Sequence, residues 1–261
     1  MGMKSMLVAL VVCYTLFTLT FYSLQRRFLY FPQLASEVYG EMNTCFVVDG
    51  AQLCGWVLNE GQTKALIYYG GNAESIEANI PLFKAIAPNY TIYLIPYRGY
   101  GINLGTPTEK VLYNDAVQIF LSVEGNHDSI SLMGRSLGSG IATYVAANQK
   151  VDKLILVTPF DSIENVAKDI YWMFPISWLI KDKYRSADRV KDITALTYIF
   201  IAEEDRVILR ARTDQLIAKF DVQLVDVVVI AGAGHNTISQ FPSYSSRLQQ
   251  ILNRPMEHSA N

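Results

Sequence analysis

The feature that most constrains this chain is a short pattern, Gly134-Arg135-Ser136-Leu137-Gly138, which separates two segments of different periodicity. Ser129 to Met133 is an apolar run that predicts a buried strand, and Ile141 to Ala147 predicts a helix. A strand, a sharp turn and a helix form the setting in which Gly-x-Ser-x-Gly exposes its serine as a nucleophile. Alone the pattern is weak, because glycine and serine often meet in ordinary turns. It needs support from the rest of the chain.

The composition fits one large α/β domain rather than a nucleic-acid-binding or disulfide-rich protein. The chain has 261 residues, 51% of them apolar, and a net charge of −2. No basic block predicts a nucleic-acid partner. Three cysteines are too few for a disulfide scaffold and have no zinc-like spacing, so we expect no metal and no cofactor.

The N-terminus predicts a membrane anchor. Met6 to Leu24 carries no charge and is long enough to cross a bilayer as a helix. The run ends in Tyr-Ser-Leu-Gln-Arg-Arg and not in the small residues of a cleavage site, which favours an uncleaved anchor over a signal peptide. We therefore expect a single-pass anchor in residues 1–27 and a globular domain in residues 28–261. A buried core helix is the alternative, and flanking charges leave the orientation open.

A hairpin is expected directly after this segment. Thr44 to Val48 and Ala51 to Leu58 are strand-like, and Asp49-Gly50 between them is a preferred two-residue turn. That register places Cys45 directly opposite Cys54, close enough for a disulfide to be considered. A bridge would put the domain in an oxidising compartment, on the exported (periplasmic or lumenal) side of a membrane. The alternative is two unrelated buried thiols.

Short apolar runs then alternate with helical patterns to the end of the domain. This order predicts a mostly parallel sheet with helices on both faces, in which functional residues gather at the carboxyl ends of the strands. The expected strands are Ala65–Tyr69, Thr91–Ile95, Ser129–Met133, Leu154–Thr158, Tyr198–Ala202 and Val225–Ile230, and the helices between them include 75–86, 108–123 and 209–220.

A nucleophilic serine needs a base within hydrogen-bond reach, and the chain has three histidines. His258 lies in a polar tail, and His127 lies in a sequence typical of a surface turn. His235 follows the last expected strand on a glycine-rich loop, so we interpret it as the base. A histidine with a purely structural role is the alternative.

The base in turn needs a carboxylate that fixes its tautomer. Glu203, Glu204 and Asp205 follow a strand, and Asp205 is our candidate because it lies furthest into the loop. Asp226, within the last strand, is the weaker rival. The resulting order along the chain is Ser136, Asp205, His235, which is typical of one fold class that carries such a triad.

An oxyanion hole would complete the site. One donor is expected from the backbone N–H of Leu137, directly after the serine. The loop Gly70-Gly71-Asn72-Ala73 follows an earlier strand, and the N–H of Asn72 is the second candidate. The same glycines also fit a plain strand-to-helix loop with Asn72 near the helix cap.

With these residues assembled, the chain resembles the serine α/β-hydrolases, and more narrowly their small-lid, membrane-anchored group that includes protein depalmitoylases. The matching motifs lie between about residues 28 and 250 and are Gly70–Ala73, Pro96–Gly101, Gly134–Gly138, Asp205-Arg206-Val207 and Gly234-His235-Asn236. Two positions depart from the family pattern, because Gly70 replaces a histidine and Pro96 replaces an aspartate. The resemblance implies an enzyme that performs acyl transfer. The two departures weaken the inference that this chain shares the substrate of the depalmitoylases.

Residues 160–192 stand where this fold carries its lid and hold a cluster of aromatic side chains. We expect Trp172, Phe174 and Trp178 to line an apolar acyl pocket. An ordinary packed helix pair broken by Pro175 is one alternative, and a patch that faces the bilayer is another. The loop from Tyr97 to Thr106 is expected to border the same cleft, with Arg98 structural.

Together these features predict a membrane-anchored serine hydrolase that cleaves an ester or thioester of a small acyl-ester or lipid-like substrate. A peptidase of the same fold, and a noncatalytic binding protein that keeps the fold, are the alternatives.

Overall fold

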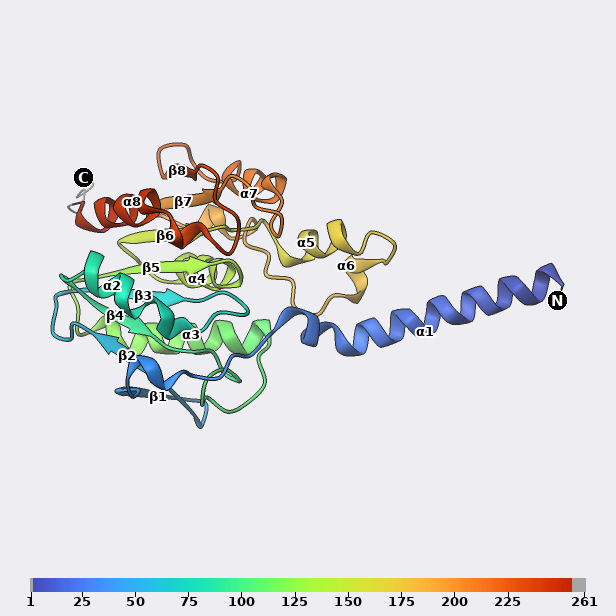
Figure 1. Ribbon diagram of the computed structural model, residues 1–261, viewed down its shortest axis with the longest axis horizontal. Coiled ribbons are helices and arrows are strands. Elements are labelled where there is room, and N and C mark those ends of the chain that lie inside the picture. The colour runs from blue at the N-terminus through green and yellow to red at the C-terminus, as the bar shows by residue number, and fades with distance from the viewer. Residues whose placement is uncertain (1, 255–261) are drawn as a thin grey trace.

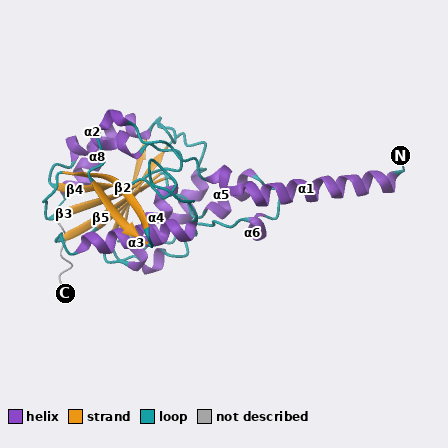
Figure 2. Ribbon diagram, turned by 90° about the horizontal axis from the view of Figure 1, so that it is seen from below, coloured by secondary structure: helices purple, strands orange, loops and turns teal. Residues whose placement is uncertain are grey.

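The computed structural model describes residues 2–254, and within them one eight-stranded sheet lies between two layers of helices (Figures 1 and 2). The strand order is β1-β2-β4-β3-β5-β6-β7-β8. The β1–β2 and β2–β4 pairs are antiparallel, and every later pair is parallel. The strands are β1 (Thr44–Val48), β2 (Ala51–Leu58), β3 (Lys64–Tyr69), β4 (Tyr90–Leu94), β5 (Ser129–Arg135), β6 (Lys153–Val157), β7 (Leu196–Ala202) and β8 (Val225–Ile230).

Helices cover both faces of the sheet, as the alternating pattern predicts. Side chains of α3 and α4 pack in the core on one face, and those of α2 and α8 pack on the other. Helix α8 is the one large element that the sequence pattern did not reveal. The helices are α1 (Met3–Leu29), α2 (Ile80–Ile86), α3 (Glu109–Glu124), α4 (Leu137–Asn148), α5 (Ile163–Ile170), α6 (Ile176–Leu179), α7 (Arg210–Ile217) and α8 (Pro242–Asn253).

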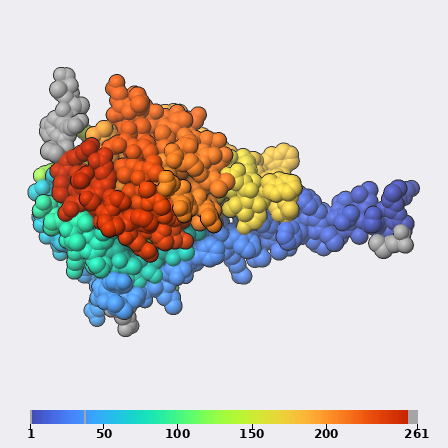
Figure 3. Space-filling view, turned by 45° about the horizontal axis from the view of Figure 1, so that its top comes forward, coloured from blue at the N-terminus to red at the C-terminus, as the bar shows by residue number. Residues whose placement is uncertain are grey.

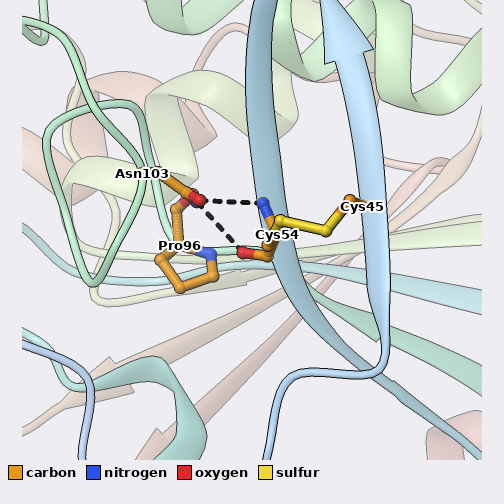
Figure 4. Close-up of a disulfide and its surroundings, with 4 residues drawn as sticks. All are labelled: Cys45, Cys54, Pro96 and Asn103. Atoms are coloured by element: carbon orange, nitrogen blue, oxygen red, sulfur yellow. Dashed lines mark hydrogen bonds between the residues drawn. A yellow bond between two sulfur atoms is a disulfide. The ribbon is translucent and has the colours of Figure 1, made fainter.

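The first hairpin has the predicted register and carries a disulfide. Cys45 pairs with Cys54 across β1 and β2, and a bridge joins them. Figure 4 shows how Asn103 holds the same point from the loop after β4. The side-chain oxygen of Asn103 accepts from the Cys54 N–H at 2.8 Å. Its side-chain NH₂ group donates to the backbone carbonyl oxygens of Cys54 and Pro96 at 3.1 and 2.7 Å. The antiparallel edge of the sheet is thus fixed to that loop.

Helix α1 projects from the body of the molecule as a single long rod (Figures 1 and 3). It is apolar and long enough to cross a membrane, with a mean hydropathy of 2.0 over its most apolar 18 residues. The helix continues two residues past the predicted boundary at 27, and the chain enters the core at once. Tyr30 is buried, and its hydroxyl lies 2.9 Å from that of Tyr184. Helix α1 therefore leads directly into the packed body of the domain.

The segment expected as a lid, residues 160–192, leaves the sheet after β6 and returns before β7. It contains α5 and the short α6, and Pro175 stands at the start of α6 as the predicted break. Both helices lie beside the part of α1 nearest the body (Figure 1).

Candidate active site

Ser136 stands at the turn between β5 and α4, in a backbone conformation that few residues adopt. Its φ angle is +50°, outside the regions that L-residues prefer, as expected for a strained elbow. A Cβ on Gly134 would collide with the carbonyl oxygen of Gly138, and a Cβ on Gly138 would collide with that of Tyr69. Both glycines are therefore required by the close approach of strand and helix.

The structure brings the three predicted catalytic side chains into one hydrogen-bonded row. Nε2 of His235 lies 2.9 Å from Oγ of Ser136, and Nδ1 lies 2.7 Å from Oδ2 of Asp205. The other Asp205 oxygen accepts the N–H groups of Val207 and Ile208, each at 2.8 Å. Because a carboxylate faces Nδ1, that nitrogen carries the proton, and Nε2 is free to accept one from the serine.

The other histidines and carboxylates considered for these two roles form no hydrogen bond with Ser136 or His235 within the described residues. His127 bonds Tyr93 Oη at 2.8 Å through Nε2 and the Gln62 carbonyl at 2.9 Å through Nδ1, so its role is structural. Asp226 pairs with Arg247 at 2.9 Å, and Glu203 accepts the Gly232 N–H at 2.8 Å. His258 lies outside the described residues.

Asn72 and Leu137, the two predicted oxyanion donors, line one cavity together with Ser136. Tyr100 Oη donates to the Asn72 carbonyl at 2.7 Å, and Tyr97 Oη donates to the Gly70 carbonyl at 2.6 Å. Burial raises the pKa of both phenols, so they remain donors.

The two tyrosine contacts hold carbonyl groups of the Gly70–Ala73 loop and leave the Asn72 N–H free to bind an oxyanion. In the part of the chain that the structure describes, the backbone N–H groups of Asn72 and Leu137 have no hydrogen-bond partner. The Asn72 side chain instead donates to the carbonyl of Leu29, the last residue of α1, at 3.0 Å. The loop that carries this candidate donor is thus tied to the end of the apolar helix.

Sequence reasoning missed an ion pair that connects the loops of the site. Glu74 accepts the Gly71 N–H at 2.6 Å and the Tyr68 hydroxyl at 2.8 Å, and it lies 3.5 Å from Arg135. Arg135 also donates to the His235 carbonyl at 3.2 Å. Burial is the largest single influence on the pKa of Arg135 and lowers it. The Glu74 carboxylate and two neighbouring tyrosines together outweigh burial and raise the pKa, so the guanidinium stays charged.

The sequence places both members of this pair beside predicted functional motifs, but it does not pair them. Arg135 is the variable residue before the serine, and Glu74 directly follows the Gly70–Ala73 motif. Both positions border predicted functional loops, but nothing in their spacing indicates that the two side chains meet.

The cavity beside Ser136 is apolar and has a volume of about 210 Å³. One wall comes from α5, whose Ile163, Val166, Ala167 and Ile170 follow the spacing of one helix face. Another part of the wall comes from α1 and includes Phe21, Gln25, Phe28 and Leu29. The helix predicted only as an anchor therefore also shapes the pocket.

The prediction that Trp172, Phe174 and Trp178 line this pocket is wrong. Trp172 is 78% exposed and Trp178 is 88% exposed, and neither contributes to the cavity. Phe174 is buried, but it stacks on Phe21 of α1 rather than facing the serine. The helical spacing in α5 was the better signal, because periodicity indicates direction whereas aromatic content does not.

The two departures from the family pattern lie together. Gly70 and Pro96 both line a second cavity of about 10 Å³, to which Tyr97 and Tyr100 also contribute. The loop from Tyr97 to Thr106 borders this small cavity and not the main pocket, contrary to expectation. Arg98 is structural as predicted, because it binds Asp115 through two contacts of 3.0 and 2.6 Å.

The site contains no evident metal centre. Among residues 2–254, no three His, Cys, Asp or Glu side chains are grouped so as to hold an ion.

Comparison with known proteins gives relatives over most of the chain, although no family model matches. An uncharacterized protein of Mycobacterium tuberculosis is 31% identical over 245 residues, covering 88% of this chain and 87% of the relative. The lysophosphatidylserine lipase ABHD12 of Bos taurus is 27% identical over 221 residues. That match covers 72% of this chain and 56% of the lipase, so the chain corresponds to little more than half of that protein.

Among solved structures, the Pyrococcus furiosus esterase Pf2001 matches with a TM-score of 0.70 at 18% identity, covering 87% of this chain and 99% of that chain. At such low identity the likeness establishes the fold. Three observations point to the same superfamily. They are the serine elbow on a parallel sheet, the fold shared with the esterase, and the lipase relatives. The chain belongs to the serine α/β-hydrolase superfamily and is a hydrolase of that superfamily.

Proposed function

We propose that the protein is a serine esterase or thioesterase that acts through an acyl-enzyme on Ser136. The row from Ser136 through His235 to Asp205, with contacts of 2.9 and 2.7 Å, is the observation that carries this proposal. Ser136 Oγ attacks the acyl carbon while His235 Nε2 takes its proton. His235 then returns that proton to the leaving alcohol or thiol, and water releases the acyl group by the same route.

The negative charge that develops on the substrate oxygen is held by the N–H groups of Leu137 and Asn72. Their lack of other partners within the described residues supports this role. Asp205 keeps His235 in the correct tautomer and stabilises the imidazolium that forms. Arg135 and Glu74 position the loops and do not touch the substrate.

The substrate proposed is a lipid-like ester, with its acyl chain in the apolar cavity. The cavity lining and the name of the bovine relative, a lysophosphatidylserine lipase, both support a lipid ester. Residues 1–27 act as the anchor and 28–261 as the catalytic domain, with a lid at about 160–192. The Cys45–Cys54 bridge supports a catalytic domain on the exported side.

Labelling with a fluorophosphonate tests the nucleophile. The folded full-length protein should be labelled, and Ser136→Ala should abolish the label. Ser139→Ala is the matched control, because it removes the other hydroxyl of the elbow, which bonds the Ser136 carbonyl and not His235. Label that persists in Ser136→Ala, or its absence from folded wild type, would reject the proposed mechanism.

Deleting residues 1–27 tests the anchor separately. The deletion removes the proposed spanning segment, so the fraction of the protein in the membrane pellet should fall. A full-length protein already in the supernatant would contradict the anchor.

A further inference from the structure

We propose that the lid tip, Ile170 to Ile180, is embedded in the membrane beside α1, so that the substrate pocket opens to one leaflet. This inference rests on the proposed roles of α1 as an anchor and of Ser136 as the nucleophile. Its partner is the lipid of that leaflet, which supplies the substrate without passage through water.

The lid tip has the composition of a membrane-inserted segment. No residue from Ile170 to Ile180 is charged, whereas Lys168 and Asp169 precede the tip and Lys181 and Asp182 follow it. Trp172 is 78% exposed, Met173 55% and Trp178 88%. Exposed apolar side chains gathered in this way mark an interaction surface, and tryptophan favours the membrane interface.

Contacts with α1 hold the lid tip along the membrane helix. Tyr14 Oη donates to the Met173 carbonyl at 2.9 Å, and the ring of Phe174 lies 5.5 Å from that of Phe17. Nearer the domain, Gln25 donates to the Leu179 carbonyl at 3.0 Å and accepts from the Lys181 N–H at 2.7 Å. The lid tip is therefore held against α1 at two points along the helix, which makes it continuous with the proposed membrane-spanning surface.

These contacts set the depth of insertion. The Lys181 ammonium lies 4.0 Å from the ring centre of Tyr22, which marks a charged boundary on α1. From Tyr22 to Tyr14 the helix rises about 12 Å, since each residue adds about 1.5 Å. Half of a hydrocarbon core is about 15 Å, so the lid tip ends within one leaflet. From Tyr22 back to Met3 the helix rises about 28 Å, close to the full core thickness of about 30 Å.

The pocket lies at this same boundary. Phe21 and Phe28 of α1 form part of its wall, and Ile170, Tyr171 and Ile180 of the lid form another part. A lipid whose acyl chain stays in the leaflet can thus slide between α1 and the lid until its ester meets Ser136. The substrate class that fits is a membrane-resident amphiphile with its ester near the headgroup.

Tryptophan fluorescence tests the inserted position directly. The chain has three tryptophans: Trp56 lies in the core, and Trp172 and Trp178 lie in the lid tip. We would place the full-length protein in phosphatidylcholine vesicles with bromine on the acyl chains, and compare Trp172→Phe/Trp178→Phe, which retains only Trp56. Quenching of the lid-tip emission by bromine, with little effect on Trp56, supports insertion. Quenching by aqueous iodide and not by bromine overturns it.

An activity comparison then tests access from the leaflet. Trp172→Asp/Trp178→Asp should lower hydrolysis of a long-chain ester within the vesicles by about tenfold, because charged residues insert poorly. Fluorophosphonate labelling of Ser136 in the same variant should be unchanged. Equal hydrolysis by wild type and variant would overturn lateral access. Wild type that is inserted but not labelled would instead reject the proposed catalytic function.

Discussion

The proposed reaction centre and the proposed substrate pocket of this protein are built in different ways. Ser136, Asp205 and His235 are polar, follow the ends of three strands and are fixed by directional hydrogen bonds. The pocket lining is mostly apolar, and much of it comes from α1 and α5. In the proposed mechanism, the sheet therefore positions the reacting groups, whereas elements outside the sheet select the substrate.

The largest expected effect comes from the proposed reaction centre, and the two histidines that the structure describes provide the comparison. His235→Gln should reduce kcat/KM by at least about 10⁴-fold, because the serine loses its base. His127→Gln removes the histidine that bonds Tyr93 and should leave activity within about threefold while lowering stability by about 1 kcal/mol. Ester hydrolysis and thermal unfolding of both variants measure the difference.

A loss of activity in His127→Gln equal to that in His235→Gln would contradict the assignment of His235 as the base. Circular dichroism of both proteins controls for misfolding.

The meeting of Ser136, Asp205 and His235 was predictable because the position of each residue follows from topology. Parallel strands end at one edge of the sheet, so side chains just after β5, β7 and β8 converge whatever the intervening sequence. The Cys45–Cys54 register followed similarly, because a two-residue turn fixes the pairing of its strands. The Glu74–Arg135 pair was not predictable, since two loops distant in sequence must meet for it to form.

A second effect concerns the link between the reaction centre and the oxyanion loop. Glu74→Gln keeps the shape of the side chain but removes its charge opposite Arg135. We expect kcat to fall about tenfold with KM nearly unchanged, because a displaced amide stabilises the transition state less. Asn79→Ala, which removes another partner of Glu74, is the control and should retain most activity.

If Glu74→Gln instead raised KM and left kcat unchanged, the pair would belong to substrate binding and not to loop positioning. Steady-state kinetics with a soluble short-chain ester separates these outcomes.

The pocket wall provides the third comparison. Val166→Trp should fill part of the cavity and reduce kcat/KM for long acyl chains about tenfold, with a small effect on acetate esters. In detergent, where no bilayer is present, Trp172→Ala should leave both rates within about twofold, because Trp172 does not line the cavity. A stronger effect from Trp172→Ala would restore the pocket assignment that the structure corrects.

The pocket residues were harder to predict because apolar composition does not give direction. Phe174 and Trp178 are as apolar as Ile163, yet only Ile163 lines the cavity beside Ser136. The contribution of α1 was hidden for a related reason. A charge-free helix indicates a membrane span, and nothing in its composition indicates that its last turns pack against the lid and the oxyanion loop.

The smallest effect is a pH dependence at the base of the lid. Burial alone would raise the pKa of Glu164, but hydrogen bonds from Arg185 and Lys168 outweigh it and lower the pKa to about 2. A carboxylate with a lowered pKa stabilises the fold fully above its usual value near 4.5 and loses that contribution as the pH falls towards 2. Because its partners are half exposed, the loss should be about 1 kcal/mol.

Thermal unfolding of wild type and Glu164→Gln between pH 6 and pH 3 measures this contribution. The advantage of wild type should shrink as the pH falls, and a constant difference would contradict it.

The central claim is that Ser136 performs acyl transfer in a pocket shaped for a lipid chain. The most direct measurement is kcat/KM for esters of increasing acyl length, in wild type and in Ser136→Ala. We expect kcat/KM to rise with chain length in wild type and to fall by at least about 10³-fold at every length in Ser136→Ala. Hydrolysis that survives in Ser136→Ala, or that is fastest for acetate and declines with length, would contradict the account.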